Sequence, residues 1–229
     1  MNILSTINLL NHFSDCKNTK MLFSSSSEAY ASSYTINPDL EFPTKEDIPL
    51  SIADVFNPRY SYGGSKLVCE LLIINFAKRF GFPYSIIRYH NIYGPRMGYK
   101  HVIPEFILRI LKKEDPFKIY GSRQTRAFCF VQDAVNATIA VNESKKTKSE
   151  IIHIGNSDEE IEIQDLAKKL FLVANYNAII EDQSPKQGSV NRRCPNISKL
   201  KRLTGIYPEI YLKEGLEITY KWYIENAEM

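Results

Sequence analysis

The chain has no long apolar run, no metal-binding spacing and little net charge, and each of these argues against a class of protein or site. No apolar run approaches the roughly eighteen residues that a membrane span needs, so we expect no membrane protein. The four cysteines lie far apart and the four histidines show no HExxH spacing, which leaves a metal site unsupported and favours reduced cysteines in a cytoplasmic protein. The formal net charge of +3, with 29 basic and 26 acidic residues interleaved, is too weak for a nucleic-acid binder.

A glycine-rich turn is also missing. Doubly wound dinucleotide-binding folds place such a turn after their first strand, with an acidic residue about twenty positions later. None of the ten glycines forms a GxGxxG or GxxGxxG pattern, and the one adjacent pair lies within YSYGGSK, residues 60–66. The sequence therefore lacks the segment that grips the pyrophosphate of a dinucleotide in such folds.

The pattern of apolar residues predicts alternating helices and strands. Helices are expected at 2–13, 62–80, 102–112, 132–142 and 163–174, with two more after residue 197. Strands are expected at 20–26, 83–95, 117–121, 126–131, 151–156 and 178–182. Residues 31–59 hold four prolines among charged residues and are expected to form a long surface loop. Such alternation predicts an α/β fold with a mostly parallel sheet.

Tyr62 and Lys66 carry the chemistry that the sequence suggests. Residues four apart on a helix face the same side. A phenol, with a reference pKa near 10, is a poor base at neutral pH, but a nearby ammonium favours the phenolate. Such a tyrosine can take the proton of a substrate hydroxyl while a nicotinamide takes the hydride, and a serine on the neighbouring strand end can hold the same oxygen. Taken alone the spacing is weak, because a surface tyrosine and lysine on a solvated helix show it too.

Six blocks in order resemble the extended short-chain dehydrogenase/reductase superfamily. They read FSSSSEAY, NPRYSYGGSK, IIRYHNIYGPRM, IYGSRQTRAFCFVQDAVNA, HIGN and GSVNRRCPNISKLKRLTG, and the resemblance runs from residue 1 to about residue 220. The branch is the NAD-dependent nucleotide-sugar epimerases, dehydratases and decarboxylases. The resemblance implies a Rossmann-like, doubly wound parallel sheet that lacks its N-terminal strands, with a smaller C-terminal substrate-binding domain.

The resemblance also implies a domain plan and partners. Residues 1–95 would be the C-terminal half of the NAD-binding Rossmann domain. Residues 96–229 would mainly form the substrate-binding domain, with segments near 126–155 returning to the Rossmann sheet. NAD is the implied cofactor, a nucleotide diphosphate sugar the substrate, and a homodimer through the helix of Tyr62 and Lys66 the assembly.

The family's catalytic positions are matched by four residues. Tyr62 matches the base, Lys66 its partner, Ser26 the serine that hydrogen-bonds the sugar hydroxyl, and Glu28 a candidate acid or base for a second step. As a structural alternative, Glu28 simply ends its strand in water.

The family's binding positions are matched by further residues. Tyr62 and Lys66 also match cofactor-binding positions, and Tyr89 and His90 lie where the backbone passes the nicotinamide. The positions that hold the substrate are matched by Asn91, Arg126 and Arg193. Arginine suits this task because its planar fork pairs with two phosphate oxygens at once. An ion pair with Asp133 is the alternative for Arg126, and Arg192 could face inward in place of Arg193.

Ser27 and Glu28 separate the branches of the family. Dehydratases usually carry an Asp-Glu pair here, so Ser-Glu argues against dehydration. Ser-Glu resembles UDP-glucuronate decarboxylases, but many 4-epimerases carry the same glutamate. We expect a UDP-sugar 4-epimerase-like enzyme, with a decarboxylase-like enzyme and a non-catalytic nucleotide-sugar-binding or oligomerisation module as alternatives.

The chain begins where the family's fourth helix begins. About three strand–helix units would then lie outside it, through a misplaced start, a gene fragment or a split enzyme with a separate N-terminal half. We expect the strand at 20–26 to have an unpaired edge, and the chain alone to be poorly soluble, to bind NAD weakly and to turn over little substrate. The stripe of Val68, Leu72 and Phe76 would suit a dimer interface, although core packing explains it equally well.

Overall fold

A computed structural model describes residues 2–37, 39–185 and 188–226. Its centre is a parallel sheet in the order β1 (Met21–Ser26), β2 (Tyr84–Tyr89) and β7 (Glu150–Ile154). Ser26 pairs with Tyr89, and Tyr89 with Ile154, so the carboxyl ends of the three strands lie at one edge. Within the described residues β1 pairs only with β2. The predicted α/β fold with a parallel sheet is therefore confirmed.

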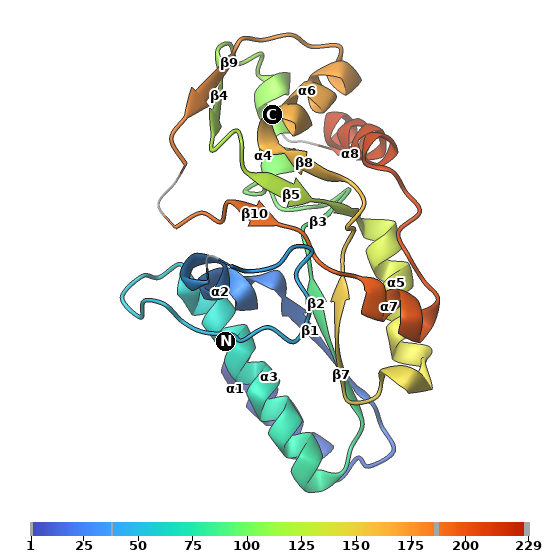
Figure 1. The fold of residues 1–229 in the computed structure, drawn as a ribbon. Helices are drawn as coiled ribbons and strands as arrows, with labels where there is room; N and C mark the ends of the chain where they lie inside the picture. The colour runs from blue at the N-terminus through green and yellow to red at the C-terminus, as the bar shows by residue number, and fades with distance from the viewer. Residues whose placement is uncertain (1, 38, 186–187, 227–229) are drawn as a thin grey trace.

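Helices cover both faces of this sheet (Figure 1). On one face α1 (Asn2–Phe13) and α3 (Tyr60–Phe80) pack through Leu10 and Ile73 against Ile86 of β2. On the other face α5 (Val131–Glu143) and α7 (Ser198–Thr204) pack against Ile87. Successive residues of a strand point to opposite faces, so a strand buried on both faces reads as a continuous apolar run. The adjacent Ile86 and Ile87 of β2 are therefore both buried, one on each face, and Arg88 is a charged residue within a buried strand.

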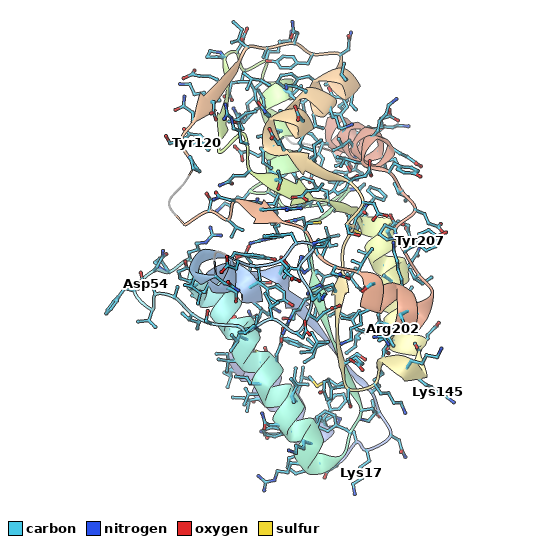
Figure 2. All side chains as sticks on the ribbon, viewed as in Figure 1. Lys17, Asp54, Tyr120, Lys145, Arg202 and Tyr207 are labelled. Atoms are coloured by element: carbon cyan, nitrogen blue, oxygen red, sulfur yellow. The ribbon has the colours of Figure 1, made fainter. Side chains whose placement is uncertain are left out.

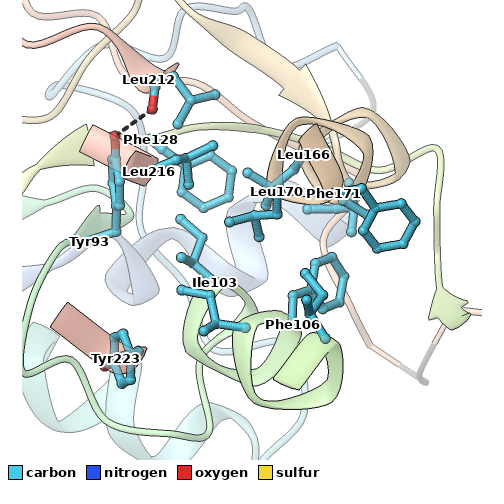
Figure 3. Packing of buried hydrophobic residues seen from close by; sticks show 14 of the residues in the cluster. Tyr93, Ile103, Phe106, Phe128, Leu166, Leu170, Phe171, Leu212, Leu216 and Tyr223 are labelled. Carbon is cyan, nitrogen blue, oxygen red and sulfur yellow. Dashed lines mark hydrogen bonds between the residues drawn. The ribbon is translucent and has the colours of Figure 1, made fainter. Parts of the chain in front are cut away.

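The second half of the molecule is built from short strands around an aromatic core (Figure 3). Its strand pairs are β3 (Ile92–Tyr93) with β6 (Cys129–Phe130), and β4 (Phe117–Tyr120) with β9 (Ile180–Gln183). A small sheet has the order β10 (Arg192–Arg193), β5 (Thr125–Ala127) and β8 (Glu160–Glu162). Helices α4 (Val102–Leu111), α6 (Ile163–Ala174) and α8 (Leu212–Asn226) surround the core. Phe117 packs edge-on against Phe106 and Phe171, with ring centroids 5.2 and 5.0 Å apart.

The prediction of a loop over residues 31–59 was wrong at its start. The turn η1 (Ser27–Tyr30) is followed directly by the helix α2 (Ala31–Ile36). The polar composition is compatible with a partly buried helix because its two buried serines hydrogen-bond the loop that follows. Ser33 donates to the carbonyl of Pro49 at 2.7 Å, and Ser32 accepts from the backbone N–H of Ala53 at 2.8 Å.

The strand predicted over residues 83–95 is also not continuous. It breaks after Tyr89 because Asn91 adopts a left-handed backbone conformation, with φ of 43°. The strand predicted over 126–131 is likewise divided between β5 and β6. A further short turn, η2 (Lys145–Thr147), precedes β7, which joins the central sheet from the region expected to return to it. The domain boundary at 95/96 stays a prediction.

Charged side chains lie on the surface of the described residues, among them Lys17, Lys145 and Arg202 (Figure 2). Within residues 2–37, 39–185 and 188–226, no helix is long and apolar enough to cross a membrane.

Candidate functional site

The predicted site residues converge where β1 and β2 end. Ser26 ends β1 and is in register with Tyr89, which ends β2. Ligands of open parallel sheets bind at this carboxyl edge. A cleft of about 510 Å³ lies there, and its polar lining includes Ser26, Ser27, Glu28, Tyr62, Asn91 and Arg193.

Gly63 allows α3 to reach the cleft. A Cβ atom at this position would lie 2.2 Å from the backbone oxygen of Glu28, so only glycine allows the helix to touch the η1 turn this closely. The contact places Tyr62, the preceding residue, at the edge of the cleft with 49% of its surface exposed.

Tyr62 and Lys66 lie together, as the sequence predicted. The Lys66 ammonium is 5.7 Å from the centre of the Tyr62 ring and 5.0 Å from that of Phe23. It donates a hydrogen bond to the carbonyl of Ser24 at 2.8 Å, which ties the helix to β1. An ammonium has three donors, so further donors remain for a ligand. Within the described residues no hydrogen bond occupies the Tyr62 hydroxyl.

Ser26 and Glu28 form the floor of the cleft beside this pair. The Ser26 hydroxyl oxygen accepts from the backbone N–H of Glu28 at 3.2 Å, which orients the turn. The Glu28 carboxylate accepts from Nη1 of Arg193 at 2.8 Å. Burial raises the pKa of the Glu28 carboxyl, but the neighbouring Arg193 and the charges of Arg59 and Arg126 outweigh it and hold the pKa below its usual value. Glu28 is therefore ionised at neutral pH, and the low pKa makes its carboxylate a weak base.

Arg193, and not Arg192, faces inward. Only 8% of the Arg193 side chain is exposed, and its Nη1 lies 3.5 Å from the hydroxyl of Ser27. Arg192 points outward and pairs with Glu160 at 2.8 Å. The buried Nε of Arg193 has no hydrogen-bond partner within the described residues, so this arginine keeps donor capacity at the cleft.

Arg126 lies next to the cleft and is held by backbone carbonyls. Its guanidinium donates to the oxygens of Thr125, Val190 and Asn191 at 2.7, 2.6 and 3.2 Å. Burial and the nearby charge of Arg193 lower the pKa of Arg126 to about 10, which still leaves it charged at neutral pH.

The alternative partner of Arg126 is occupied elsewhere. The Asp133 carboxylate accepts from the backbone N–H of Ile210 at 3.1 Å. Arg126 instead lines a second pocket, of about 290 Å³, together with Asn91, Gln124 and the rings of Phe106 and Phe128.

Asn91 lines both pockets and therefore lies at their junction. Its Nδ2 donates to the carbonyl of Ala127 at 3.0 Å. The two preceding side chains are engaged elsewhere: the Tyr89 hydroxyl lies 2.9 Å from that of Thr138, and the His90 ring is fully buried, 4.4 Å from the ring of His153. Burial and the charge of the histidine nearby hold the pKa of His90 well below its usual value. Tyr89 nevertheless lines the cleft, and the cofactor contact predicted at residues 89 and 90 stays a prediction.

A buried polar cluster beneath the cleft was missed by the sequence reasoning. Arg88 donates to both carboxylate oxygens of Glu70, from Nε at 3.0 Å and Nη2 at 2.6 Å, and Ser25 donates to the same carboxylate at 2.5 Å. A charged residue in the apolar strand SIIRY was the available signal, because buried charges need partners.

Comparisons with known proteins show the family of the chain. Residues 1–155 match the sequence profile of the NAD dependent epimerase/dehydratase family. The chain belongs to this family. It is 35% identical to a UDP-N-acetyl-alpha-D-glucosaminuronate decarboxylase from Bacillus cytotoxicus, over 90% of this chain and 65% of the relative. It is 31% identical to a UDP-glucuronate 4-epimerase from Thermodesulfobacterium geofontis, over 100% and 66%.

Solved structures resemble the chain over nearly its whole length. The UDP-glucose 4-epimerase of Thermotoga maritima, determined with UDP-glucose, matches with a TM-score of 0.86 and 28% identity, over 99% of this chain and 70% of the other. The UDP-glucuronic acid 4-epimerase of Bacillus cereus, determined with UDP-glucuronic acid and NAD, matches with a TM-score of 0.85 and 27% identity, over 98% and 67%.

These comparisons confirm the predicted family, its cofactor and its α/β fold. The family is one of NAD-dependent enzymes, and its Bacillus cereus member is an NAD complex. The chain spans about two thirds of the length of these relatives.

Proposed function

We propose that this chain supplies the substrate-binding and proton-transfer groups of an NAD-dependent enzyme that acts on nucleotide diphosphate sugars. The observation that carries the proposal is the convergence of Tyr62 and Ser26 on one cleft that also holds the Glu28–Arg193 pair. These four residues line the cleft, and the Lys66 ammonium lies 5.7 Å from the centre of the Tyr62 ring.

The residues present fit one end of NAD. Lys66 has donors left for the hydroxyls of the nicotinamide ribose, and the backbone at residues 89–91 passes the cleft that Tyr62 lines. The 229 residues include no glycine-rich turn for the pyrophosphate, so this sequence supplies no comparable site for the other end. When bound there, NAD would supply the hydride acceptor for oxidation of the sugar hydroxyl.

Tyr62 is the base of the proposed reaction. Its phenolate takes the proton of a sugar hydroxyl, and the Lys66 ammonium lies one helical turn away, beside the ring. Ser26 holds the same oxygen from the end of β1, which limits the hydroxyl to one orientation. Return of the proton from Tyr62 completes the cycle.

The two pockets divide the substrate between them. We assign the sugar to the cleft of Tyr62 and Glu28, and the nucleoside to the pocket lined by Phe106 and Phe128. The diphosphate would then lie near the junction at Asn91, close to the arginines that line the two pockets. Charge-assisted hydrogen bonds from arginine suit this task.

The 4-epimerase reaction is our first candidate for the chemistry, because it needs only the hydroxyl oxidation just described. Decarboxylation of a UDP-uronate is the second candidate, and it is favoured by the contact of Arg193 with both Ser27 and Glu28. An arginine there could hold a sugar carboxylate. Relatives of both kinds align over at least 90% of the chain.

Turnover tests the proposal. The chain would be joined to the glycine-rich nucleotide-binding segment of a related 4-epimerase and incubated with NAD and UDP-sugars. Decarboxylation lowers the product mass, whereas epimerisation leaves the mass unchanged and is resolved by chromatography. We expect activity that Tyr62→Phe abolishes. Equal activity with and without the Tyr62 hydroxyl would contradict the proposal.

We further propose the two-domain plan and a homodimer through α3 and α1. Leu4 and Leu9 of α1 and Leu71 of α3 are about half exposed or more. The stripe predicted for this role is instead partly covered, since Leu72 and Phe76 pack against the core. The four cysteines are free thiols, which suits the reducing cytoplasm. Sedimentation of the chain tests the dimer.

A further inference from the structure

A buried ion pair lies beneath the cleft and takes no part in the proposed reaction. Arg88 of β2 and Glu70 of α3 expose only 3% and 4% of their side chains. The guanidinium fork holds both carboxylate oxygens, and Ser25 of β1 donates to the same carboxylate. One carboxylate therefore joins the helix to two neighbouring strands.

The pair continues into a chain of hydrogen bonds. Nη1 of Arg88 donates to the Tyr30 hydroxyl and, at 2.9 Å, to the carbonyl of Glu46. The Tyr30 hydroxyl lies 2.7 Å from Nε2 of His153, whose Nδ1 lies 3.2 Å from the carbonyl of Asn196. A carbonyl only accepts, so Nδ1 carries the imidazole proton and Nε2 accepts from Tyr30. Each bond in the chain thus has one donor and one acceptor.

Stability alone does not explain such a pair. Removing two charges from water costs several kcal/mol per ion, and apolar residues of similar volume often stabilise a core as well or better. What an apolar pair lacks is direction: a bidentate fork fixes both the angle and the distance between the elements that it joins.

The segments that the pair joins are those that carry the proposed reacting groups. Tyr62, Lys66 and Glu70 follow one another at intervals of four residues on α3, so they share one face of the helix. Ser25 lies between Ser24, which accepts from Lys66, and Ser26. Arg88 directly precedes Tyr89, the last residue of β2 at the cleft. Tyr30 is the last residue of η1, the turn that contains Glu28.

We propose that Glu70 and Arg88 are positioning residues for Lys66. They fix the rotation of α3 against β1 and β2, so that the ammonium stays on the Ser24 carbonyl beside Tyr62. The inference deepens the proposed function and rests on it, because it is the proposed function that gives Lys66 a catalytic task.

The test compares lysine reactivity in the full chain, without cofactor or sugar. Acetylation by an activated ester is followed residue by residue with mass spectrometry, and Lys66 is expressed relative to Lys78, an exposed lysine of the same helix. The double variant Glu70→Leu/Arg88→Met removes the pair and leaves the net charge unchanged. We expect it to stay folded while the Lys66-to-Lys78 ratio rises by about threefold or more, since order can be lost locally without global unfolding.

A control and a second variant make the result decisive. Asp165→Asn/Lys168→Met removes an exposed pair on α6 and should leave the ratio unchanged. An unchanged ratio in the folded double variant would overturn the proposal. If the double variant does not unfold cooperatively, Glu70→Gln, which keeps the shape of the side chain, is measured in its place, and an unchanged ratio there overturns the proposal equally. Failure of the turnover assay would leave this result standing, so the two hypotheses are separable.

Discussion

Gly63 offers a sharp test of how closely α3 packs against the site. An alanine Cβ would lie 2.2 Å from the backbone oxygen of Glu28 and 2.9 Å from its carbonyl carbon, and neither backbone atom can rotate away. Gly63→Ala must therefore separate α3 from η1 by about 1 Å. Alanine favours a helix over glycine by about 1 kcal/mol, but overpacking costs about 1–3 kcal/mol. We expect a net loss of up to about 2 kcal/mol in the free energy of unfolding.

Gly64 provides the matched control one residue along the helix. An alanine Cβ there meets the Cδ1 atom of Ile52 at 2.9 Å, the end of a side chain that is 44% exposed and free to move. Gly64→Ala should therefore leave the free energy of unfolding unchanged or raise it by up to about 1 kcal/mol. Urea unfolding followed by circular dichroism measures both variants.

The same displacement should affect turnover. A shift of about 1 Å between reacting groups can cost about 100-fold in rate. In the chain joined to a nucleotide-binding segment, Gly63→Ala should therefore lower the turnover rate about 100-fold, even where the protein stays folded. Equal stability of the Gly63→Ala and Gly64→Ala variants would refute the close packing of α3 on Glu28. Full activity of the Gly63→Ala variant would show that the close packing of α3 on Glu28 does not matter for the reaction.

Two further predictions concern charge. Arg193→Met should weaken the binding of UDP-glucuronate about tenfold or more in calorimetry, because a charge-assisted contact is lost, whereas Arg192→Met should leave affinity nearly unchanged; equal losses would contradict the assignment. Burial, with the nearby charge of Arg88, lowers the pKa of His153 to about 3 from 6.5. The unfolded chain then binds an extra proton between these values, so stability is full above pH 6.5 and falls by about 1.4 kcal/mol per unit below it. Urea titrations from pH 4.5 to 7 measure the free energy of unfolding, which should depend less on pH in His153→Asn than in the unchanged chain. The same pH dependence in both proteins would contradict this prediction.

Local patterns in the sequence were sufficient for most of the fold. The apolar periodicity of residues 163–174 predicts α6 with the bounds that the structure has, because that helix buries one continuous face. The strands β8 and β10 were missed because three and two residues carry no periodicity. They are strands only through pairing with β5 on either side.

The candidate site was predictable in its residues but not in its pairings. Tyr62 and Lys66 are neighbours on one helix, so spacing alone places them together. The Glu28–Arg193 pair joins residues 165 positions apart, and no local pattern reports such a contact. The choice between Arg192 and Arg193 likewise depends on which face of β10 meets the cleft.

The most direct test of the central claim is the position of a bound nucleotide sugar in the full chain. UDP-glucuronate serves as the probe, the tyrosine rings are isotopically labelled, and Tyr62→Phe assigns the Tyr62 signals. The account predicts nuclear Overhauser effects between the sugar ring protons and the Tyr62 ring. Sugar contacts confined to other tyrosines, such as Tyr207 (Figure 2), would contradict it.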